Sequence, residues 1–149
     1  MHEHERGNAK RSGLRVVFDT NVYISLFTSP ESTIFPIWEH ALKGSYDLFL
    51  SRAIANEVGR ILRDEFFWNN ANITQHIKFL SRVAELVAPT IIPNVIPEDP
   101  PDNHIFACAI AGEANLIVTR DLDLLRRKSY EGIGIVTPID FLHMLEEED

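Results

Sequence analysis

The stretch LRVVFDTN, residues 14–21, decides how the chain can fold. Its first five residues are apolar except for one arginine, which is typical of a strand in the interior of a sheet. The run ends at Asp19, and a carboxylate at the edge of a core is costly unless a hydrogen-bond donor, an opposite charge or a metal ion compensates it. The rest of the sequence has to supply that compensation.

Strand-like runs alternate with helical patterns along the whole chain. The predicted strands are residues 14–18, 46–50, 88–92, 116–118 and 133–136. Three helices are predicted over residues 33–44, 72–87 and 122–127. Four more are predicted by their starts: one near Asn21, and one each after a capping residue at Ser51, Asp99 and Thr137. Strands that alternate with helices indicate an α/β protein with a parallel sheet covered on both faces.

The composition fits one compact domain. The chain has 149 residues, of which 45% are hydrophobic, enough for a two-layer or three-layer core. We expect residues 1–12 to be a polar, disordered extension, 13–146 the domain and 147–149 an acidic tail. The single cysteine, Cys108, excludes an internal disulfide and is expected in the core. No apolar run approaches the roughly 20 residues of a membrane span and no signal-peptide pattern opens the chain, so we expect a cytoplasmic protein with no membrane contact.

The charge balance limits how the chain can bind nucleic acid. Its net charge is −8, with 22 acidic and 14 basic residues. A protein that binds nucleic acid by phosphate neutralisation alone shows the opposite balance. A phosphate-bearing substrate would therefore need local help from metal ions or from a small basic cluster such as Arg126, Arg127 and Lys128.

Four carboxylates occupy positions where a parallel sheet gathers ligands. Asp19 and Asp121 follow strands, Asp102 lies in the first turn of a helix, and Glu57 flanks the apolar stripe of another helix. Each also has a purely structural interpretation, because the aspartates can cap helices and a lone Glu57 can be a solvated boundary residue. Four converging carboxylates would repel one another, however, and a hard divalent cation such as Mg²⁺ or Mn²⁺ removes that conflict.

Other sites with a carboxylate at a strand end fit less well. A haloacid-dehalogenase-type phosphatase needs a second aspartate two residues after the first, where this chain has Asn21, and a receiver domain needs an acidic pair after its first strand. No serine lies in a nucleophile-elbow pattern, and no pair of His or Cys has zinc-binding spacing. His104 is expected on the surface or in helix packing.

The order of these residues resembles the PIN-domain family, and within it the toxin components of prokaryotic toxin–antitoxin systems. The resemblance rests on VVFDTN, NEV, DPPDNHIFACAIAGEANLIVTRDLDLL and GIGIVTPIDFL, and covers residues 14 to about 145. It implies a three-layer α/β/α sandwich around a central parallel sheet, with metal-dependent ribonuclease activity that leaves a 3′-hydroxyl and a 5′-phosphate.

The resemblance also implies roles for individual residues. The catalytic acids would be Asp19, Glu57, Asp102 and Asp121, with Glu57 orienting or deprotonating the attacking water. The ligands of one or two Mg²⁺ or Mn²⁺ ions would be Asp19, Asp102, Asp121 and Asp123. Supporting residues would be Thr20, Asn21, Asn103 and Thr119, and RNA contacts could come from Arg120, Arg126, Arg127 and Lys128.

Alternatives and partners stay open at this point. A binding module that engages an antitoxin or another protein, with little or no catalysis, could keep the same fold and use the same carboxylates as caps. DNA cleavage is a third option, but the sequence shows no insertion for threading a flap. The expected partners are an RNA substrate, a cognate antitoxin and a second copy of the chain. Phe66, Phe67 and Trp68 could form a groove for an antitoxin helix, although an end-of-helix core cluster is the preferred interpretation.

Overall fold

One mixed sheet forms the centre of the molecule. The computed structural model describes residues 13–29, 34–96 and 100–147. Its six-stranded sheet has the order β3-β2-β1-β4-β6-β5. The strands are β1 (Arg15–Phe18), β2 (Asp47–Ser51), β3 (Glu85–Val87), β4 (Leu116–Val118), β5 (Ser129–Tyr130) and β6 (Ile133–Val136). Every neighbouring pair is parallel except β5 with β6, which confirms the predicted fold class and adds one antiparallel edge.

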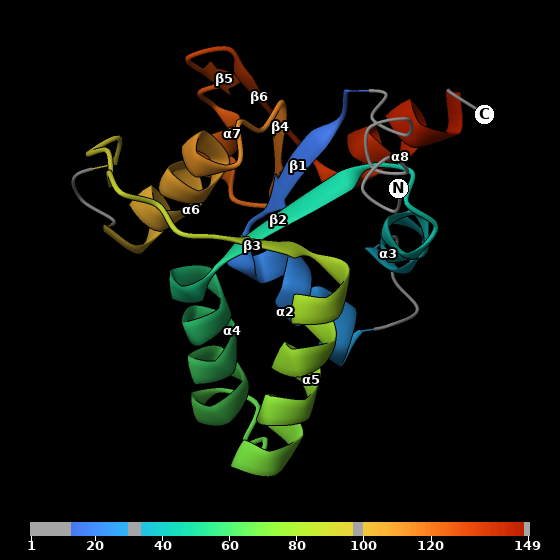
Figure 1. Cartoon of the computed structure of the whole chain (residues 1–149), viewed down its shortest axis with the longest axis vertical. Helices are drawn as coiled ribbons and strands as arrows, with labels where there is room; N and C mark the ends of the chain where they lie inside the picture. Colours follow the sequence, from blue (N-terminus) through green and yellow to red (C-terminus); the bar gives the residue numbers. More distant parts are fainter. Residues whose placement is uncertain (1–12, 30–33, 97–99, 148–149) are drawn as a thin grey trace, which may run out of the picture.

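Helices cover both faces of this sheet. They are α2 (Thr20–Thr28), α3 (Ile34–Leu42), α4 (Arg52–Asp64), α5 (Asn70–Val83), α6 (Pro100–Ala111), α7 (Leu122–Leu125) and α8 (Pro138–Glu147). Figure 1 shows α6 and α7 on one side of the sheet and α3 and α8 on the other, with α4 and α5 extending as a pair beyond the carboxyl ends of the strands. No helix in the described part of the chain is long and apolar enough to cross a membrane.

The central strand explains why Asp19 lies where it does. β1 pairs with β2 on one side and β4 on the other, and Val16, Val17 and Phe18 are at most 1% exposed. The ladder continues past the strand ends, because the backbone N–H of Asp19 donates to the carbonyl of Val118 at 2.9 Å. The residues that follow β1 and β4 are therefore held side by side at the middle of the sheet's carboxyl edge.

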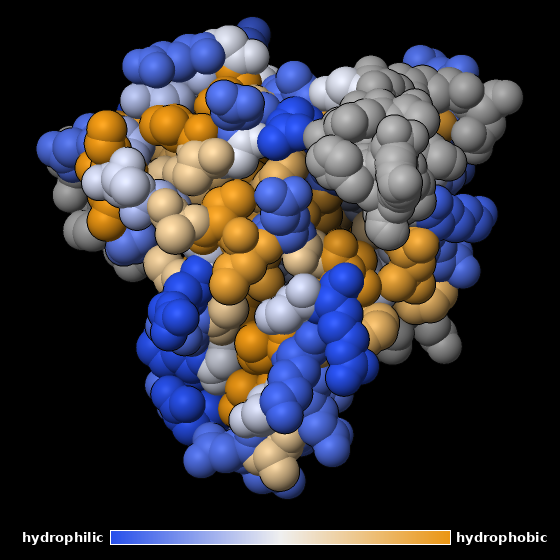
Figure 2. All heavy atoms as spheres, viewed as in Figure 1, coloured by the Kyte–Doolittle hydropathy of each residue, from blue (hydrophilic) through white to orange (hydrophobic). Residues whose placement is uncertain are grey.

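Helix α4 pairs with α5 through one apolar face. Ile54, Val58 and Leu62 are buried on α4, at the helical spacing that the sequence predicts. Figure 2 shows hydrophilic side chains on the outer flanks of α4 and α5 and a strip of apolar side chains between them.

The predicted strand at 88–92 is wrong, and so is the helix predicted to run to residue 87. α5 ends at Val83, and residues 85–87 form β3. The register gives the physical reason: Val87 pairs with Ser51, the last residue of β2, so no strand lies beside residues 88–92. Pro89 also has no backbone N–H to donate to a neighbouring strand. Helix α5 also begins earlier than predicted, because Asn69 is its N-cap: Oδ1 of Asn69 accepts from the backbone N–H of Asn72 at 2.7 Å.

Strand β5 is absent from the sequence prediction. It is only two residues long and pairs with β6 through a turn in which Glu131 and Gly132 both have positive φ, at 48° and 84°. Two consecutive positive φ values are typical of the tight hairpin turns that match strand twist. So short a strand has no periodicity to detect.

Phe66 and Phe67 are not the end-of-helix core cluster that was predicted. Their exposed fractions are 43% and 86%, and only Trp68 is half-buried, in ring contact with Phe27. The cause is the end of α4 at Asp64, after which Phe67 has a φ of 60° and the helical period no longer applies.

Two other predictions are confirmed. Cys108 is fully buried, and Thr137 caps α8 by accepting a hydrogen bond from the N–H of Asp140. The predicted extension 1–12, the Asp99 cap and residues 148–149 of the tail lie outside the described residues.

Candidate active site

Asp19 is buried at the end of β1 and held by three hydrogen bonds. It is 5% exposed, and its Oδ1 accepts from the backbone N–H of Thr20 at 2.6 Å. Its Oδ2 accepts from the hydroxyl of Thr119 at 2.6 Å and from the side-chain amide of Asn21 at 3.2 Å. Asp19 is also the N-cap of α2. The structural interpretation of this residue is therefore correct, and it does not exclude a second role.

Asp121 is positioned by the same threonine. The backbone N–H of Asp121 donates to Oγ1 of Thr119 at 2.9 Å, so one hydroxyl contacts both strand-end acids. Asp121 in turn caps α7 by accepting from the N–H of Asp123 at 2.9 Å. The caps fix both carboxylates at the edge of the sheet.

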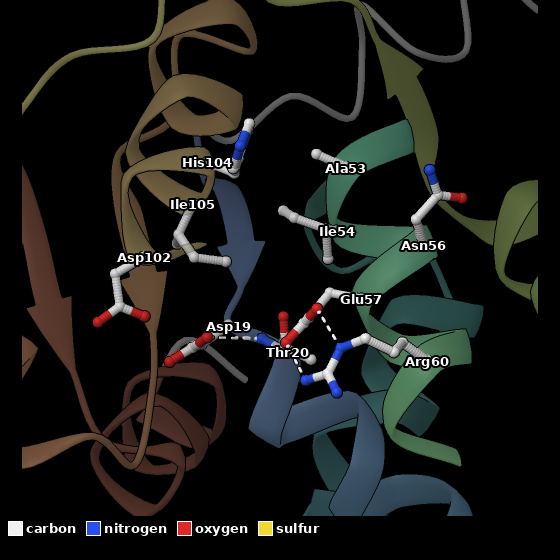
Figure 3. A pocket seen from close by; sticks show the side chains of 10 residues that line it. All are labelled: Asp19, Thr20, Ala53, Ile54, Asn56, Glu57, Arg60, Asp102, His104 and Ile105. Carbon is white, nitrogen blue, oxygen red and sulfur yellow. Dashed lines mark hydrogen bonds and ion pairs between the residues drawn. The ribbon is translucent and has the colours of Figure 1, made fainter. Parts of the chain in front are cut away.

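Two adjoining cavities bring the four predicted catalytic acids together. The first, of about 570 Å³, is lined by Asp19, Glu57 and Asp102 among others, and its residues are drawn in Figure 3. The second, of about 390 Å³, is lined by Asp19, Asp102 and Asp121. Because Asp19, Thr20 and Asp102 line both, the cavities are two parts of one acidic depression beside α4.

Glu57 is paired with Arg60, a residue that the sequence patterns do not single out. The guanidinium holds both carboxylate oxygens, with Nε to Oε1 at 3.0 Å and Nη2 to Oε2 at 2.8 Å (Figure 3). The hydrogen bonds from Arg60 lower the pKa of Glu57 below its ordinary value, against an opposing effect of burial. Arg60 itself lines the first cavity. The only signal in the sequence is a spacing of three residues between Glu57 and Arg60, which is common on solvated helix surfaces.

Three other predicted residues contribute differently. Thr20 lines both cavities and Asn21 lines the second. Asn103 is buried but faces the preceding loop: its Oδ1 accepts from the N–H groups of Val95 and Ile96 at 2.9 and 2.8 Å, and its amide donates to the carbonyl of Ile96 at 3.1 Å. Asn103 thus fixes the approach to α6 and hence the helix that carries Asp102.

The predicted basic cluster and Asp123 line neither cavity. Asp123 is about 72% exposed and forms an ion pair with Arg126. Arg127 donates to the carbonyl of Val95 at 2.8 Å, and Arg120 and Lys128 are exposed. His104, for which a surface or packing role was expected, is half-buried and lines the first cavity and another beside β3.

The donor set suits a hard cation without forming a finished metal site. Within 13–29, 34–96 and 100–147, no three His, Cys, Asp or Glu side chains are grouped so that they could hold a metal ion. The second cavity nevertheless offers carboxylate oxygens from Asp19, Asp102 and Asp121. Mg²⁺ commonly binds through one or two carboxylates, with water and substrate phosphate completing its coordination. The residues present therefore fit Mg²⁺ or Mn²⁺ in chemical type.

Comparison with known proteins identifies the same architecture. A family model described as PIN domain matches residues 15–123. No curated protein is significantly similar in sequence.

Three solved structures share the fold at low sequence identity. VapBC2 from Rickettsia felis, bound to a DNA fragment from its promoter, is 12% identical, with a TM-score of 0.64, 83% of this chain covered and 98% of the other. VapBC-1 from nontypeable Haemophilus influenzae is 17% identical, with a TM-score of 0.56 and coverage of 76% and 92%. PAE2754 from Pyrobaculum aerophilum is 15% identical, with a TM-score of 0.62 and coverage of 90% of each chain.

Proposed function

The chain belongs to the PIN-domain family, and from this premise we propose that it is a Mg²⁺- or Mn²⁺-dependent ribonuclease that acts as the toxin of a toxin–antitoxin pair. The observation that carries the proposal is the convergence of Asp19, Asp102 and Asp121 on one cavity, with Glu57 in the adjoining one. Capping alone explains why Asp19 and Asp121 are aspartates, but it does not explain why Asp102 and Glu57 face the same depression.

The three aspartates would hold the cation, and when bound the cation supplies Lewis-acid activation of water and neutralises phosphate charge. Thr119 keeps the Asp19 carboxylate turned toward the cavity, and Asn21 contacts the same oxygen. The reaction forms a bond from water oxygen to phosphorus and breaks the bond from phosphorus to the 3′ oxygen, which leaves as a 3′-hydroxyl opposite a 5′-phosphate.

Glu57 has the role of orienting the attacking water. Its pKa is lowered by Arg60, so the carboxylate is charged at neutral pH and accepts hydrogen bonds well. A carboxylate whose pKa lies at or below the ordinary glutamate value is a weak proton acceptor at neutral pH, because an efficient general base has a pKa near the working pH. Orientation is therefore the better assignment, and the released proton passes to solvent.

A partner and a location complete the proposal. The VapBC structures with the same fold are toxin–antitoxin complexes, which supports a cognate antitoxin for this chain. A toxin that cleaves RNA would work in the cytoplasm, where it could also form a homodimer. The second candidate is a binding module without catalysis, and one observation favours it: Asp19 and Asp121 have capping roles that do not require a metal.

The decisive experiment is cleavage of a mixed RNA pool by purified, partner-free protein with Mg²⁺, with Mn²⁺ and with chelator. The Asp19→Asn variant keeps an effective N-cap and should remain folded but lose cleavage. Asp140→Asn, which changes an exposed aspartate on α8, is the matched control and should keep full activity.

Metal-dependent cleavage that disappears in Asp19→Asn and persists in Asp140→Asn is the expected result. Full activity in Asp19→Asn would refute the site. Absence of cleavage by the folded wild-type protein under either metal would favour the binding module.

A further inference from the structure

Arg60 is the one lysine or arginine among the described residues that line the two cavities. Its guanidinium lies beside Glu57 at the edge of the first cavity, and in this view Thr20 lies between Arg60 and Asp19 (Figure 3). An anionic substrate that enters this cavity meets Asp19, Glu57 and Asp102. Arg60 is therefore the cationic side chain best placed to offset their repulsion of a phosphate.

The guanidinium has the capacity and the access for such a contact. Arginine has five N–H donors, and two of them are used on Glu57, with a third nitrogen, Nη1, at 3.7 Å from Oδ2 of Asp64. The side chain is 47% exposed, so a ligand can reach it. A planar guanidinium binds phosphate in the same forked geometry in which it binds a carboxylate.

The pair with Glu57 is replaceable. Exposed ion pairs between residues three apart on a helix contribute little to stability. A phosphate that brings two charge-assisted hydrogen bonds can therefore take the place of the Glu57 carboxylate at modest cost. Once displaced, Glu57 has both oxygens available to the cavity.

We propose that Arg60 is a positioning residue that binds a backbone phosphate of the RNA substrate and in doing so releases the Glu57 carboxylate toward the attacking water. This inference rests on the proposed function, which it extends by naming the contact that admits the substrate. The simpler interpretation is that Arg60 only stabilises α4, and the two interpretations differ in what they predict for RNA affinity.

The first test measures binding of a fluorescein-labelled single-stranded RNA, in Mg²⁺, to protein made cleavage-deficient by Asp19→Asn. Arg60→Met should weaken binding about tenfold, the effect of losing one charge-assisted contact. It should also reduce the slope of log K against log salt by about 0.7, the contribution of one phosphate contact on a single strand. Arg63→Met is the matched control, because Arg63 lies on the same helix, is 52% exposed and pairs with Asp64, yet lines neither cavity.

A second test isolates the release of Glu57. Glu57→Gln removes a negative charge and also frees Arg60, so it should tighten RNA binding in the otherwise unchanged cleavage-deficient protein. In the Arg60→Met background, Glu57→Gln removes only the negative charge, so the gain in RNA affinity should be clearly smaller. Equal gains in the two backgrounds would overturn the release step.

Steady-state cleavage separates positioning from a structural role. Arg60→Met should raise KM, Arg60→Lys should recover part of the loss, and Arg63→Met should change neither KM nor kcat. If wild-type protein cleaves RNA but Arg60→Met and Arg63→Met behave alike in binding and in KM, the inference fails while the proposed function stands. If wild-type protein binds RNA through Arg60 but never cleaves it, the nuclease proposal fails and the phosphate contact stands.

Discussion

The hydroxyl of Thr119 donates a hydrogen bond of 2.6 Å to Oδ2 of Asp19, although the two residues are 100 positions apart in the chain. The parallel pairing of β1 with β4 creates this contact, because Phe18 is in register with Val118. The same Oγ1 accepts from the N–H of Asp121 at 2.9 Å. One fully buried hydroxyl therefore sets the positions of two acids that come from different strands.

Thr119→Val should damage the site while the fold survives. Valine keeps the shape of threonine but leaves Oδ2 of Asp19 without its hydroxyl donor. The loss of a buried hydrogen bond to a charged group is expected to cost about 1.5–3 kcal/mol of unfolding free energy. With Asp19 in its proposed role as a metal ligand, loss of this hydrogen bond should lower kcat about 10-fold to 100-fold.

Denaturant titration and RNA cleavage measure these two effects. Thr119→Ser retains the hydroxyl and should recover most of the activity. Wild-type activity in Thr119→Val would show that the orientation of Asp19 does not depend on this hydrogen bond.

Glu57 should contribute to stability at neutral pH and lose that contribution in acid. Its pKa is lowered in the folded protein, first by the hydrogen bonds from Arg60. The charged form is therefore favoured by folding, so the stabilisation is present above the unfolded pKa and is lost as the pH falls through the folded one. The side chain is 30% exposed, which limits the contribution to less than about 1 kcal/mol.

Unfolding of wild-type protein and Glu57→Gln at a series of pH values tests this sign. The difference in free energy should be constant from pH 7 down to about 4.5 and should shrink below it. A difference that grows toward low pH would mean that Arg60 does not hold the Glu57 carboxylate in solution.

Asn103→Ala should reduce stability more than any substitution of the exposed basic residues. Its amide makes three hydrogen bonds to the backbone of Val95 and Ile96, in a region where Ile96 is 5% exposed. Alanine would leave backbone groups without partners, at a cost of about 1–3 kcal/mol for each that stays buried. We call these three hydrogen bonds the Asn103 clamp. Because Asn103 directly follows Asp102 in the chain, RNA cleavage should fall as well.

The conservative variant Asn103→Asp separates the two parts of the clamp. It keeps an acceptor for the N–H groups of Val95 and Ile96 and loses the donor to the carbonyl of Ile96. Its stability should lie between those of wild-type protein and Asn103→Ala in the same thermal or denaturant measurement. Equal stability of all three proteins would contradict the clamp.

The sequence singles out the acids that line the two cavities, but it does not single out the arginine beside them. Asp19 stands out because an apolar strand ends on it, and such a strand is buried on both faces whatever the details of packing. Arg60 does not stand out, because its pairing with Glu57 has the spacing of an ordinary surface ion pair. Only the placement of α4 beside the sheet edge, which is a tertiary property, gives that pair a cavity to face.

Strand position was predictable only where periodicity and register agree. The run at 88–92 contains β-branched residues, yet β2 ends opposite Val87 and offers no partner beyond it. The assignment of β3 to residues 85–87 follows from the length of β2, which a local pattern does not contain. The hydrogen bonds of Asn103 were not predictable for a similar reason, because their partners Val95 and Ile96 lie eight and seven residues earlier, in a loop with no periodic pattern.

Phe67→Gly should stabilise the protein slightly although it removes an aromatic ring. The ring is 86% exposed, so little buried apolar surface is lost. Phe67 has a φ of 60°, a conformation that costs a residue with a side chain about 1–2 kcal/mol, whereas glycine adopts it freely and loses about 0.5–1 kcal/mol through the entropy of the unfolded chain. The net gain in the free energy of unfolding should lie between about 0 and 1.5 kcal/mol.

Phe66→Gly provides the contrast on the neighbouring residue. Phe66 is only 43% exposed and is not among the described residues with positive φ, so glycine there should reduce stability. Both changes would appear as shifts of the denaturant midpoint with an unchanged slope. Destabilisation by Phe67→Gly comparable to that by Phe66→Gly would show that the Phe67 ring packs on the protein in solution and that its backbone conformation is not strained.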